Sequence, residues 1–274
     1  MLNSHTLWCK RACAEILSRK DDFAPLLLDI LDEAIKDPAP FLSAERSDHI
    51  PAAYLLANMR VKEAYPKLVA LLKFDEDDIE DLWGDILTQS YNWFLRDTYN
   101  GDISLLTELI KDRSIASWGR AMAILAYGMH YYDKHIKRED ICLFFSYLID
   151  DIYSDTKPDH YDEITVLSYV AICIREHKLE ELTDYVKRLY AKEIIDIYMC
   201  ETLDQYLGEW NHPYFTTEDT HIDDAVKELE NWGWFKEHTE IDDDDEFDDD
   251  DFDDEDYDEF DEDYDDDDEE NDDE

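Results

Sequence analysis

Apolar residues recur at intervals of three and four along most of the chain up to about residue 235. The stretch 78–132 shows the pattern most clearly, as three amphipathic segments separated by polar breaks at 99–102 and 111–114. This spacing places the apolar side chains on one face of a helix. No one of the three segments can cover its apolar face alone, so each needs a packing neighbour, as in stacked helical pairs.

Breaks of the same kind divide the rest of the chain. Residues 37–40 read Asp-Pro-Ala-Pro and end a helix, because proline removes a backbone donor and restricts the residue before it. No stretch alternates convincingly as a strand would, which predicts an all-α fold with helices of roughly 10–20 residues. The aromatic stretch 201–215 is predicted to be irregular.

The unit of two helices and their loops recurs on the order of every 35–45 residues, the period of HEAT-like repeats. We therefore predict a HEAT-like α-solenoid of stacked antiparallel helix pairs over residues 1–240. A second region, 241–274, is predicted to be a disordered tail rich in Asp and Glu.

Charge separates the tail from the body. The chain carries 74 acidic and 25 basic residues, a net charge of −49. Of the 33 residues from 242 to 274, 27 are acidic and none is basic, so the remainder holds 47 acids against 25 bases. Binding to nucleic acid depends on Lys and Arg neutralising phosphates, so this balance argues against direct nucleic-acid binding.

The predicted environment is the cytoplasm. The start of the chain lacks the continuous apolar core of a secretory signal, and no run of about 18 apolar residues suggests a membrane span. The five cysteines are an odd number, widely spread and in apolar surroundings, which favours free buried thiols over a disulfide framework.

Two stretches resemble a bacterial HEAT-like family of unknown function, DUF1186. One is His-Ile-Pro-Ala-Ala-Tyr-Leu-Leu-Ala at 49–57 followed by Ala-Tyr-Pro-Lys-Leu at 64–68; the other comprises 84–88, 99–102, 109–110 and 120–121. The resemblance covers about residues 27–151 and implies an α-solenoid with no agreed activity. Some similar proteins end in a Cys/His metal-binding module, which is not carried over because this chain has no cysteine after Cys200. The family-like positions, for which we expect structural roles in capping, turns or an internal salt bridge, are Gly84, Asp85, Asn100, Gly101, Asp102 and Arg120.

Metal and cation sites are weakly indicated, and we predict none. His5, Cys9 and Cys13 share one helix face, but a fourth ligand is not evident and helix cysteines are usually core residues. Residues 97–108 have the length of a calcium loop but lack oxygen donors at its third and fifth positions. The acidic stretch 75–85 could bind a cation or basic peptide; a solvated helix start is the simpler interpretation.

Nothing in the sequence indicates catalysis or a cofactor. Phosphate-binding, zinc-protease and nucleophile-elbow motifs are missing, and His130 with His135 and His160 with Glu163 are isolated pairs. We therefore predict a non-enzyme. The aromatic stripe Trp83, Tyr91, Trp93 and Phe94 could line a groove, although core packing is the simpler expectation.

The tail suggests a class of partner. It places aromatic rings every three to five residues within the acidic run, and a tail that only confers solubility has no need of them. Rings within acidic chain suit a basic, partly apolar protein surface. The predicted partner-binding residues are Phe247, Phe252, Tyr257, Phe260 and Tyr264.

The predicted function is a protein-interaction scaffold, such as a chaperone or competitor for basic proteins. Three alternatives remain open: a tail that only confers solubility, an autoinhibited adaptor whose tail covers basic groups of its own body (Lys10, Arg11, Arg19 and Lys20), and a metal-binding protein or uncharacterised enzyme. The sequence leaves the oligomeric state undetermined.

Overall fold

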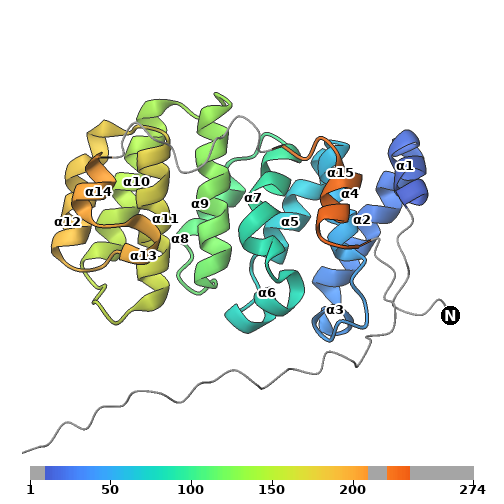
Figure 1. Cartoon of the computed structure of the whole chain (residues 1–274), viewed down its shortest axis with the longest axis horizontal. Helices are drawn as coiled ribbons and strands as arrows, with labels where there is room; N and C mark the ends of the chain where they lie inside the picture. Colours follow the sequence, from blue (N-terminus) through green and yellow to red (C-terminus); the bar gives the residue numbers. More distant parts are fainter. Residues whose placement is uncertain (1–9, 209–220, 235–274) are drawn as a thin grey trace, which may run out of the picture. The chain divides into compact units, whose positions relative to one another are not determined.

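The computed structural model describes residues 10–208 and 221–234, all within one unit of the chain, Met1–Lys236. The regular structure in these ranges is helical throughout and contains no strand, which confirms the all-α prediction for them (Figure 1). The predicted disordered region 241–274 and its boundary lie outside the described residues.

Five helices form a row in which each packs on the next. They are α2 (Lys20–Lys36), α4 (His49–Asn58), α7 (Ile86–Asp97), α9 (Ser117–Tyr132) and α11 (Tyr161–Glu176). Helices α4, α9 and α11 are buried on nearly every side. A helix covered on all sides needs apolar residues around its whole circumference, and these three have them.

Further helices pack along this row. Helix α5 (Tyr65–Leu71) contacts α2 and α7, α8 (Ser104–Lys111) contacts α9, and α10 (Arg138–Tyr153) contacts α9 and α11. This is consistent with helix pairs, although the HEAT-like solenoid stays a prediction. The remaining elements are α1 (Lys10–Ser18), α3 (Ala39–Leu42), η1 (Lys62–Ala64), α6 (Glu76–Trp83), η2 (Glu180–Leu182), α12 (Thr183–Ala191), α13 (Ile197–Cys200), α14 (Leu203–Gly208) and α15 (Ala225–Asn231).

Several helices are shorter than the sequence pattern predicted. Helix α14 lies in the stretch that was expected to be irregular, and a tertiary contact explains it. The Tyr206 ring is fully buried, and its hydroxyl donates to the carbonyl of Ala171 at 2.7 Å. A single helical turn is unstable alone, so its packing on α11 supplies the stability.

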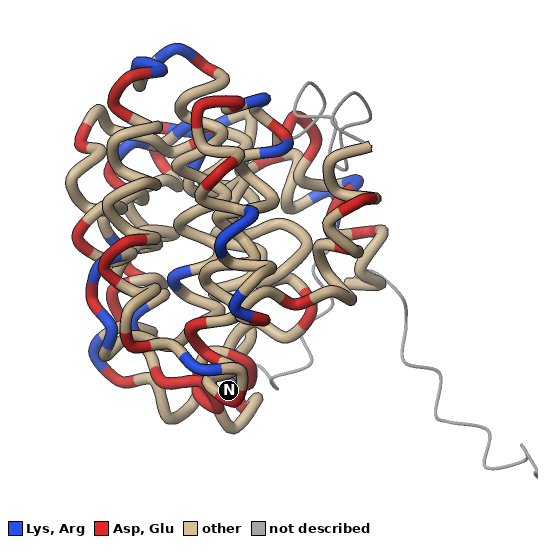
Figure 2. The backbone as a smooth tube through the Cα atoms, turned by 90° about the vertical axis from the view of Figure 1, so that its left-hand side faces the viewer, with Lys and Arg blue, Asp and Glu red and all other residues tan. Residues whose placement is uncertain are grey.

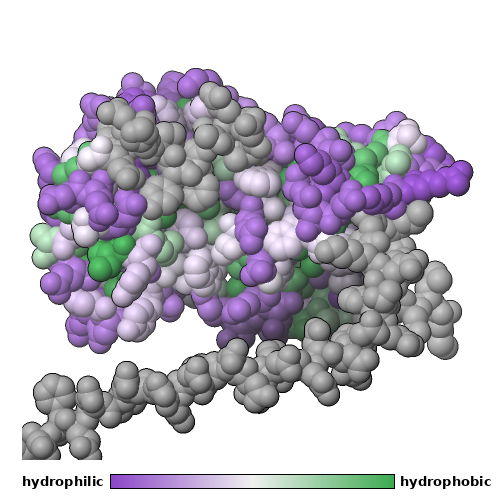
Figure 3. All heavy atoms as spheres, viewed as in Figure 1, coloured by the Kyte–Doolittle hydropathy of each residue, from purple (hydrophilic) through white to green (hydrophobic). Residues whose placement is uncertain are grey.

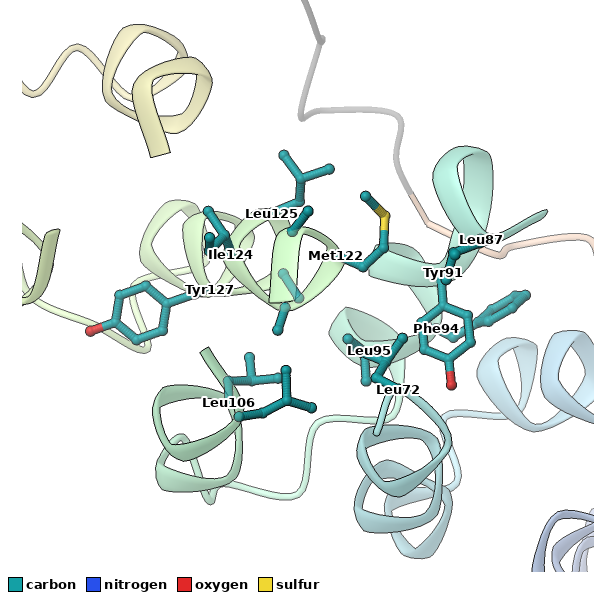
Figure 4. Close-up of a cluster of buried hydrophobic side chains, with 14 of the residues drawn as sticks. Leu72, Leu87, Tyr91, Phe94, Leu95, Leu106, Met122, Ile124, Leu125 and Tyr127 are labelled. Carbon is teal, nitrogen blue, oxygen red and sulfur yellow. The ribbon is translucent and has the colours of Figure 1, made fainter. Parts of the chain in front are cut away.

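The core is continuous between α5, α7, α8 and α9. Figure 4 shows side chains from these helices meeting, among them Leu95 of α7, Leu106 of α8 and Met122 of α9. Close approach to α9 depends on small residues: a Cβ at Gly119 would lie 2.3 Å from the carbonyl oxygen of Leu72 at the end of α5. Such a contact is far inside van der Waals distance, so only glycine fits there.

Five helices of the described part end in the same turn. In each, one residue takes a left-handed φ of +50° to +78°, and the next residue's N–H bonds to a carbonyl five residues earlier. This is the Schellman motif, which brings the side chains at the two ends of that bond into contact. The contacting pairs are Leu56/Val61 after α4, His130/His135 after α9, Ile174/Leu179 after α11, Leu189/Ile194 after α12 and Leu229/Trp234 after α15.

We predict that the protein loses stability as the pH falls, because His49, the first residue of α4, is buried. Its side chain is 1% exposed, and its Nε2 donates to the carbonyl oxygen of Leu82 at 2.7 Å. Burial lowers its pKa from 6.5 to about 4. Below about pH 6.5 the histidine is protonated in the unfolded chain, whereas in the folded chain it stays neutral down to about pH 4. The stability that is present above pH 6.5 is therefore lost progressively as the pH falls from 6.5 to 4. The loss is about 3 kcal/mol at 1.36 kcal/mol per pKa unit.

Urea unfolding of the parent and of His49→Gln at pH 7 and pH 4.5 measures this term. The difference in unfolding free energy between the two proteins should shrink as the pH falls, because only the parent loses the histidine contribution. A difference that stays constant with pH would contradict the assignment.

Candidate functional site

A cavity of about 360 Å³ opens where the loop between α8 and α9 meets the start of α11. Five of its lining residues are charged, two arginines and three carboxylates, which gives the lining a formal charge of −1. Its lining residues are Arg113, Ile115, Arg120, Asp159, His160, Tyr161, Asp162 and Glu163.

Both arginines of the cavity are held by one carboxylate. Glu163, in the first turn of α11, accepts from Nε of Arg113 at 2.7 Å through Oε1 and from Nη1 of Arg120 at 3.3 Å through Oε2. Arg120 also donates from Nε to the carbonyl of Ile110 at 3.0 Å. An internal salt bridge was one of the roles considered for Arg120 from the sequence, and in the structure its partner is Glu163.

Arg120 is the more deeply buried of the two arginines, with a side chain 2% exposed against 38% for Arg113. Burial lowers the pKa of Arg120, and the charge of Glu163 and the hydrogen bond to it oppose that shift. An arginine stays protonated in proteins, so the pair is a buried ion pair. Glu163 is therefore committed to the arginines and does not act as an open acid at the cavity.

The rim of the cavity is different, because its acids face solvent. Asp159 and Asp162 are exposed, and the ring of Tyr161 between them is 78% exposed. The partial positive charge at the start of α11 opposes a bound cation, but the carboxylates of Asp162 and Glu163 lie in that first turn and offset it. Two exposed carboxylates beside an aromatic ring can bind a lysine or arginine side chain, although Oδ1 of Asp159 also lies 3.9 Å from Nε2 of His160.

The family-like turn residues have local structural roles. Gly84 (φ +50°) ends α6, where its N–H donates to the carbonyl of Glu80. Asn100 accepts from the N–H of Asp102 at 2.9 Å, and Asp102 accepts from the N–H of Ser104 at 3.0 Å. Gly101 between them takes φ +99°.

Asp85, by contrast, makes no side-chain cap bond to α7. Its φ of −61° and ψ of −20° are helical, so its backbone continues into α7 and its side chain does not close the helix end. The capping role expected for Asp85 is therefore not seen.

Two carboxylates of the acidic stretch 75–85 accept hydrogen bonds at helix N-termini. Asp75 accepts from the N–H of Asp78 and caps α6. Glu76 reaches across to α9, where its carboxylate accepts from the N–H of Ser117 at 3.0 Å and from the Ser117 hydroxyl at 2.9 Å. Carboxylates are favourable at helix starts, so the structure supports the simpler interpretation of this stretch.

The aromatic stripe on α6 and α7 is mostly core. Trp83, Tyr91 and Phe94 are each no more than 1% exposed and pack edge to face. Trp93 is half-buried and lines a second cavity, of about 230 Å³, together with Trp232. The core interpretation is confirmed for the three buried rings.

The candidate metal face at the N-terminus and the tail aromatics lie largely outside the described residues. Of His5, Cys9 and Cys13, only Cys13 is described, and it is fully buried. The tail residues Phe247, Phe252, Tyr257, Phe260 and Tyr264 are all outside the described ranges.

Three of the four described thiols are poor nucleophiles. Burial raises the pKa of Cys200 to about 12, and it raises the pKa of Cys173 and Cys142 as well. A protonated thiol is inert in nucleophilic chemistry, so these three cysteines have a structural character.

A buried network around Asp97 was not predicted from the sequence. Its carboxylate is fully buried at the end of α7 and accepts from the N–H of Ile222 at 2.7 Å, from Nδ1 of His221 and, as an ion pair, from Arg60 at 3.0 Å. These bonds attach Ile222 and His221 to the ends of α4 and α7, and the following helix, α15, packs on α4 (Figure 1). Partners 125 residues apart leave no local signal in the sequence.

No helix in the described ranges has the length and apolar character needed to cross a membrane. The face in Figure 3 is mostly hydrophilic, with separate hydrophobic patches. Acidic and basic positions are mixed along the tube in Figure 2 and do not form a basic face in that view.

Comparison with known proteins identifies a family and two relatives that match most of the chain. A family model described as "Protein of unknown function (DUF1186)" matches residues 2–236. An uncharacterized protein of Chlamydia muridarum (strain MoPn / Nigg) is 25% identical over 226 residues, covering 81% of this chain and 90% of the relative. An uncharacterized protein of Chlamydia trachomatis serovar D is 25% identical over 239 residues, covering 81% and 89%. No solved structure matches the chain.

Proposed function

The chain belongs to the DUF1186 family, and from that premise we propose that it is a non-enzymatic scaffold that binds basic proteins through its acidic tail and the rim of the α11 cavity. The predicted setting is the cytoplasm, with protein partners and no direct binding of nucleic acid or membrane. The family description assigns no activity, so the support for this proposal comes from the chemistry of the chain.

The observation that carries the proposal is that almost all arginines already form ion pairs within the protein. Nine of the ten arginines pair with a carboxylate of the described body, and the tenth, Arg11, is exposed. An arginine that already holds a carboxylate is a weak site for a phosphate backbone. The acids also outnumber all lysines and arginines, by 47 to 25 in the body and 27 to 0 in the tail, so the surplus charge of both is acidic and attracts basic partners.

The same pairing disfavours the autoinhibited adaptor. Three of the four basic groups that the tail would cover already have a partner: Lys10 contacts Glu230, Arg19 pairs with Glu15 and Asp22, and Lys20 donates to the carbonyl of Met59. The fourth, Arg11, is exposed. A tail carboxylate would have to displace these partners for little gain, since exposed ion pairs contribute at most about 1 kcal/mol.

Titration with defined peptides tests the proposal. Two probes suffice, a lysine homopolymer and a lysine peptide with tryptophan at every fourth position. Removal of residues 241–274 should lower the affinity for both peptides at low salt by at least about tenfold. Added salt should lower the affinity of the full chain, because it screens the charges. Replacing Phe247, Phe252, Tyr257, Phe260 and Tyr264 with serine should weaken only the tryptophan peptide, by about tenfold, if two or three ring contacts of about 0.5–1 kcal/mol each are lost.

Variants of the rim locate the contact on the body. The double variant Asp159→Asn/Asp162→Asn should lower the affinity for the peptides. The control double variant Asp21→Asn/Asp29→Asn makes an equal charge change at exposed positions of α2 and should lower the affinity less. Equal binding by full-length and shortened chains at low salt would refute the role of the tail. Equal effects of the two charge pairs would refute the role of the cavity.

A further inference from the structure

Two histidines meet at the C-terminal end of α9. The side chain of His130 is fully buried, His135 is exposed, and their Nδ1 atoms lie 3.5 Å apart. This distance is longer than a normal hydrogen bond between nitrogens. Two nitrogens bound to one tetrahedral Zn²⁺ at 2.0–2.1 Å lie about 3.3–3.4 Å apart. The two rings therefore already stand near the separation that a shared metal ion requires.

The backbone fixes this arrangement before any ion binds. Lys134 takes a left-handed φ of +67°, and the N–H of His135 donates to the carbonyl of His130 at 2.9 Å. The same turn ends four other helices of the described part, and in each of those the contacting pair is apolar. Packing alone is satisfied by apolar pairs, so a pair of imidazoles in this position points to a role other than packing.

A carboxylate completes the group. Asp133 lies between the two histidines in sequence, and one ligand atom from each of His130, Asp133 and His135 lies within 4.8 Å of the others. Arg96 donates to both oxygens of Asp133, at 2.6 and 2.8 Å. Burial raises the pKa of Asp133, but the Arg96 bonds and charge outweigh this and hold it below its usual value. Each oxygen keeps a second lone pair for a metal ion.

The surroundings cover one side of the group and leave the other open. The ring of Tyr99 lies over both imidazoles, with centroid distances of 4.1 Å to His130 and 4.9 Å to His135. The exposed edge of His135 leaves room for water or another ligand. The end of a helix carries partial negative charge, which favours a cation there.

We propose that His130, Asp133 and His135 form a binding site for a divalent transition metal ion of the Zn²⁺ class at the C-terminus of α9. Both histidines bind through Nδ1, Asp133 supplies the anionic oxygen, and at least one coordination position stays open. Imidazole with one carboxylate suits Zn²⁺, Co²⁺ or Ni²⁺ rather than Mg²⁺ or Ca²⁺. The site is independent of the tail and of the α11 cavity.

Metal titration of the chelator-treated full chain tests the proposal, with Zn²⁺ and spectroscopically visible Co²⁺ as probes. Excess Mg²⁺ occupies the tail carboxylates, which prefer hard cations. The parent should bind one Zn²⁺ per chain more tightly than the tail does. His135→Ala, at an exposed position, should weaken that binding by at least about tenfold, and Asp133→Asn should weaken it less. Zn²⁺ should also raise the melting temperature of the parent but not of His135→Ala.

His160→Ala is the matched control, because it removes an exposed histidine elsewhere and should change Zn²⁺ affinity less than twofold. Cys9→Ala tests the competing metal face at the N-terminus. Zn²⁺ affinity that is unchanged in His135→Ala, or lost in Cys9→Ala instead, overturns the proposal. A Co²⁺ spectrum that is the same in the parent and in His135→Ala overturns it as well.

Discussion

Replacing Asp97 with alanine is expected to lower the unfolding free energy by about 3 kcal/mol, because it removes a fully buried carboxylate that holds three partners and hydrogen bonds to charged groups contribute about 1.5–3 kcal/mol each. The Asp97 carboxylate is fully buried and accepts from the Ile222 N–H, from His221 and from Arg60. Without it, the N–H of Ile222 has lost its acceptor inside the protein. A buried donor left without a partner costs about 1–3 kcal/mol by itself.

The loss should be concentrated in the C-terminal segment. Besides Asp97, the segment before α15 is held by Asn58, whose side chain donates to the carbonyl of Ile222 at 2.8 Å. Amide hydrogen exchange of Asp97→Ala should therefore show α15 opening at a lower free energy than α9 or α11. Urea unfolding gives the global value.

Two variants make this test specific. Burial raises the pKa of Asp97, while His221, Ile222 and Arg60 lower it part of the way back, so the fold tolerates the charge at some cost. Asp97→Asn keeps an oxygen for the Ile222 N–H and should cost less than alanine. Asp223→Ala removes an 83% exposed partner of Arg60 and should cost at most about 1 kcal/mol. If Asp223→Ala is as damaging as Asp97→Ala, burial is not the source of the effect.

Glu163→Ala is the second large effect, with an expected loss of about 3–5 kcal/mol in unfolding free energy. It leaves the guanidinium of Arg120, 2% exposed, without its carboxylate in the core between α9 and α11. The measurement is again urea unfolding, with circular dichroism to confirm that the helices remain.

A double variant separates the lost ion pair from lost packing. Arg120→Met removes the charge that Glu163 neutralises, so combining it with Glu163→Ala should cost less than the sum of the single changes. Arg113→Ala leaves the buried pair intact and should cost at most about 1 kcal/mol, because Arg113 is 38% exposed. Additive single effects would show that Arg120 and Glu163 are not energetically coupled.

The His130/His135 pair shows what a sequence signal can and cannot reveal. The two residues are five apart at the end of a predicted helix, the spacing that a Schellman turn brings into contact. The left-handed residue is Lys134 rather than the glycine that usually marks such a turn, so the turn itself was not evident. The sequence contains still less indication of the pairing of Asp97 and Glu163, because their partners lie far away along the chain.

The sequence by itself determined the helical class, the positions of the main breaks and the family. It also determined the contrast in composition between the amphipathic helical region and the acidic C-terminal stretch. These follow from periodicity, composition and turn chemistry, which are local properties of the chain. Only the tertiary structure decided that α9 and α11 are covered on nearly every side, that Glu163 pairs with Arg120, and that the segment before α15 is anchored by Asp97. The physical reason is that burial and ion pairing depend on which helices meet, and contacts between residues 43 or 125 positions apart are set by packing rather than by neighbouring residues.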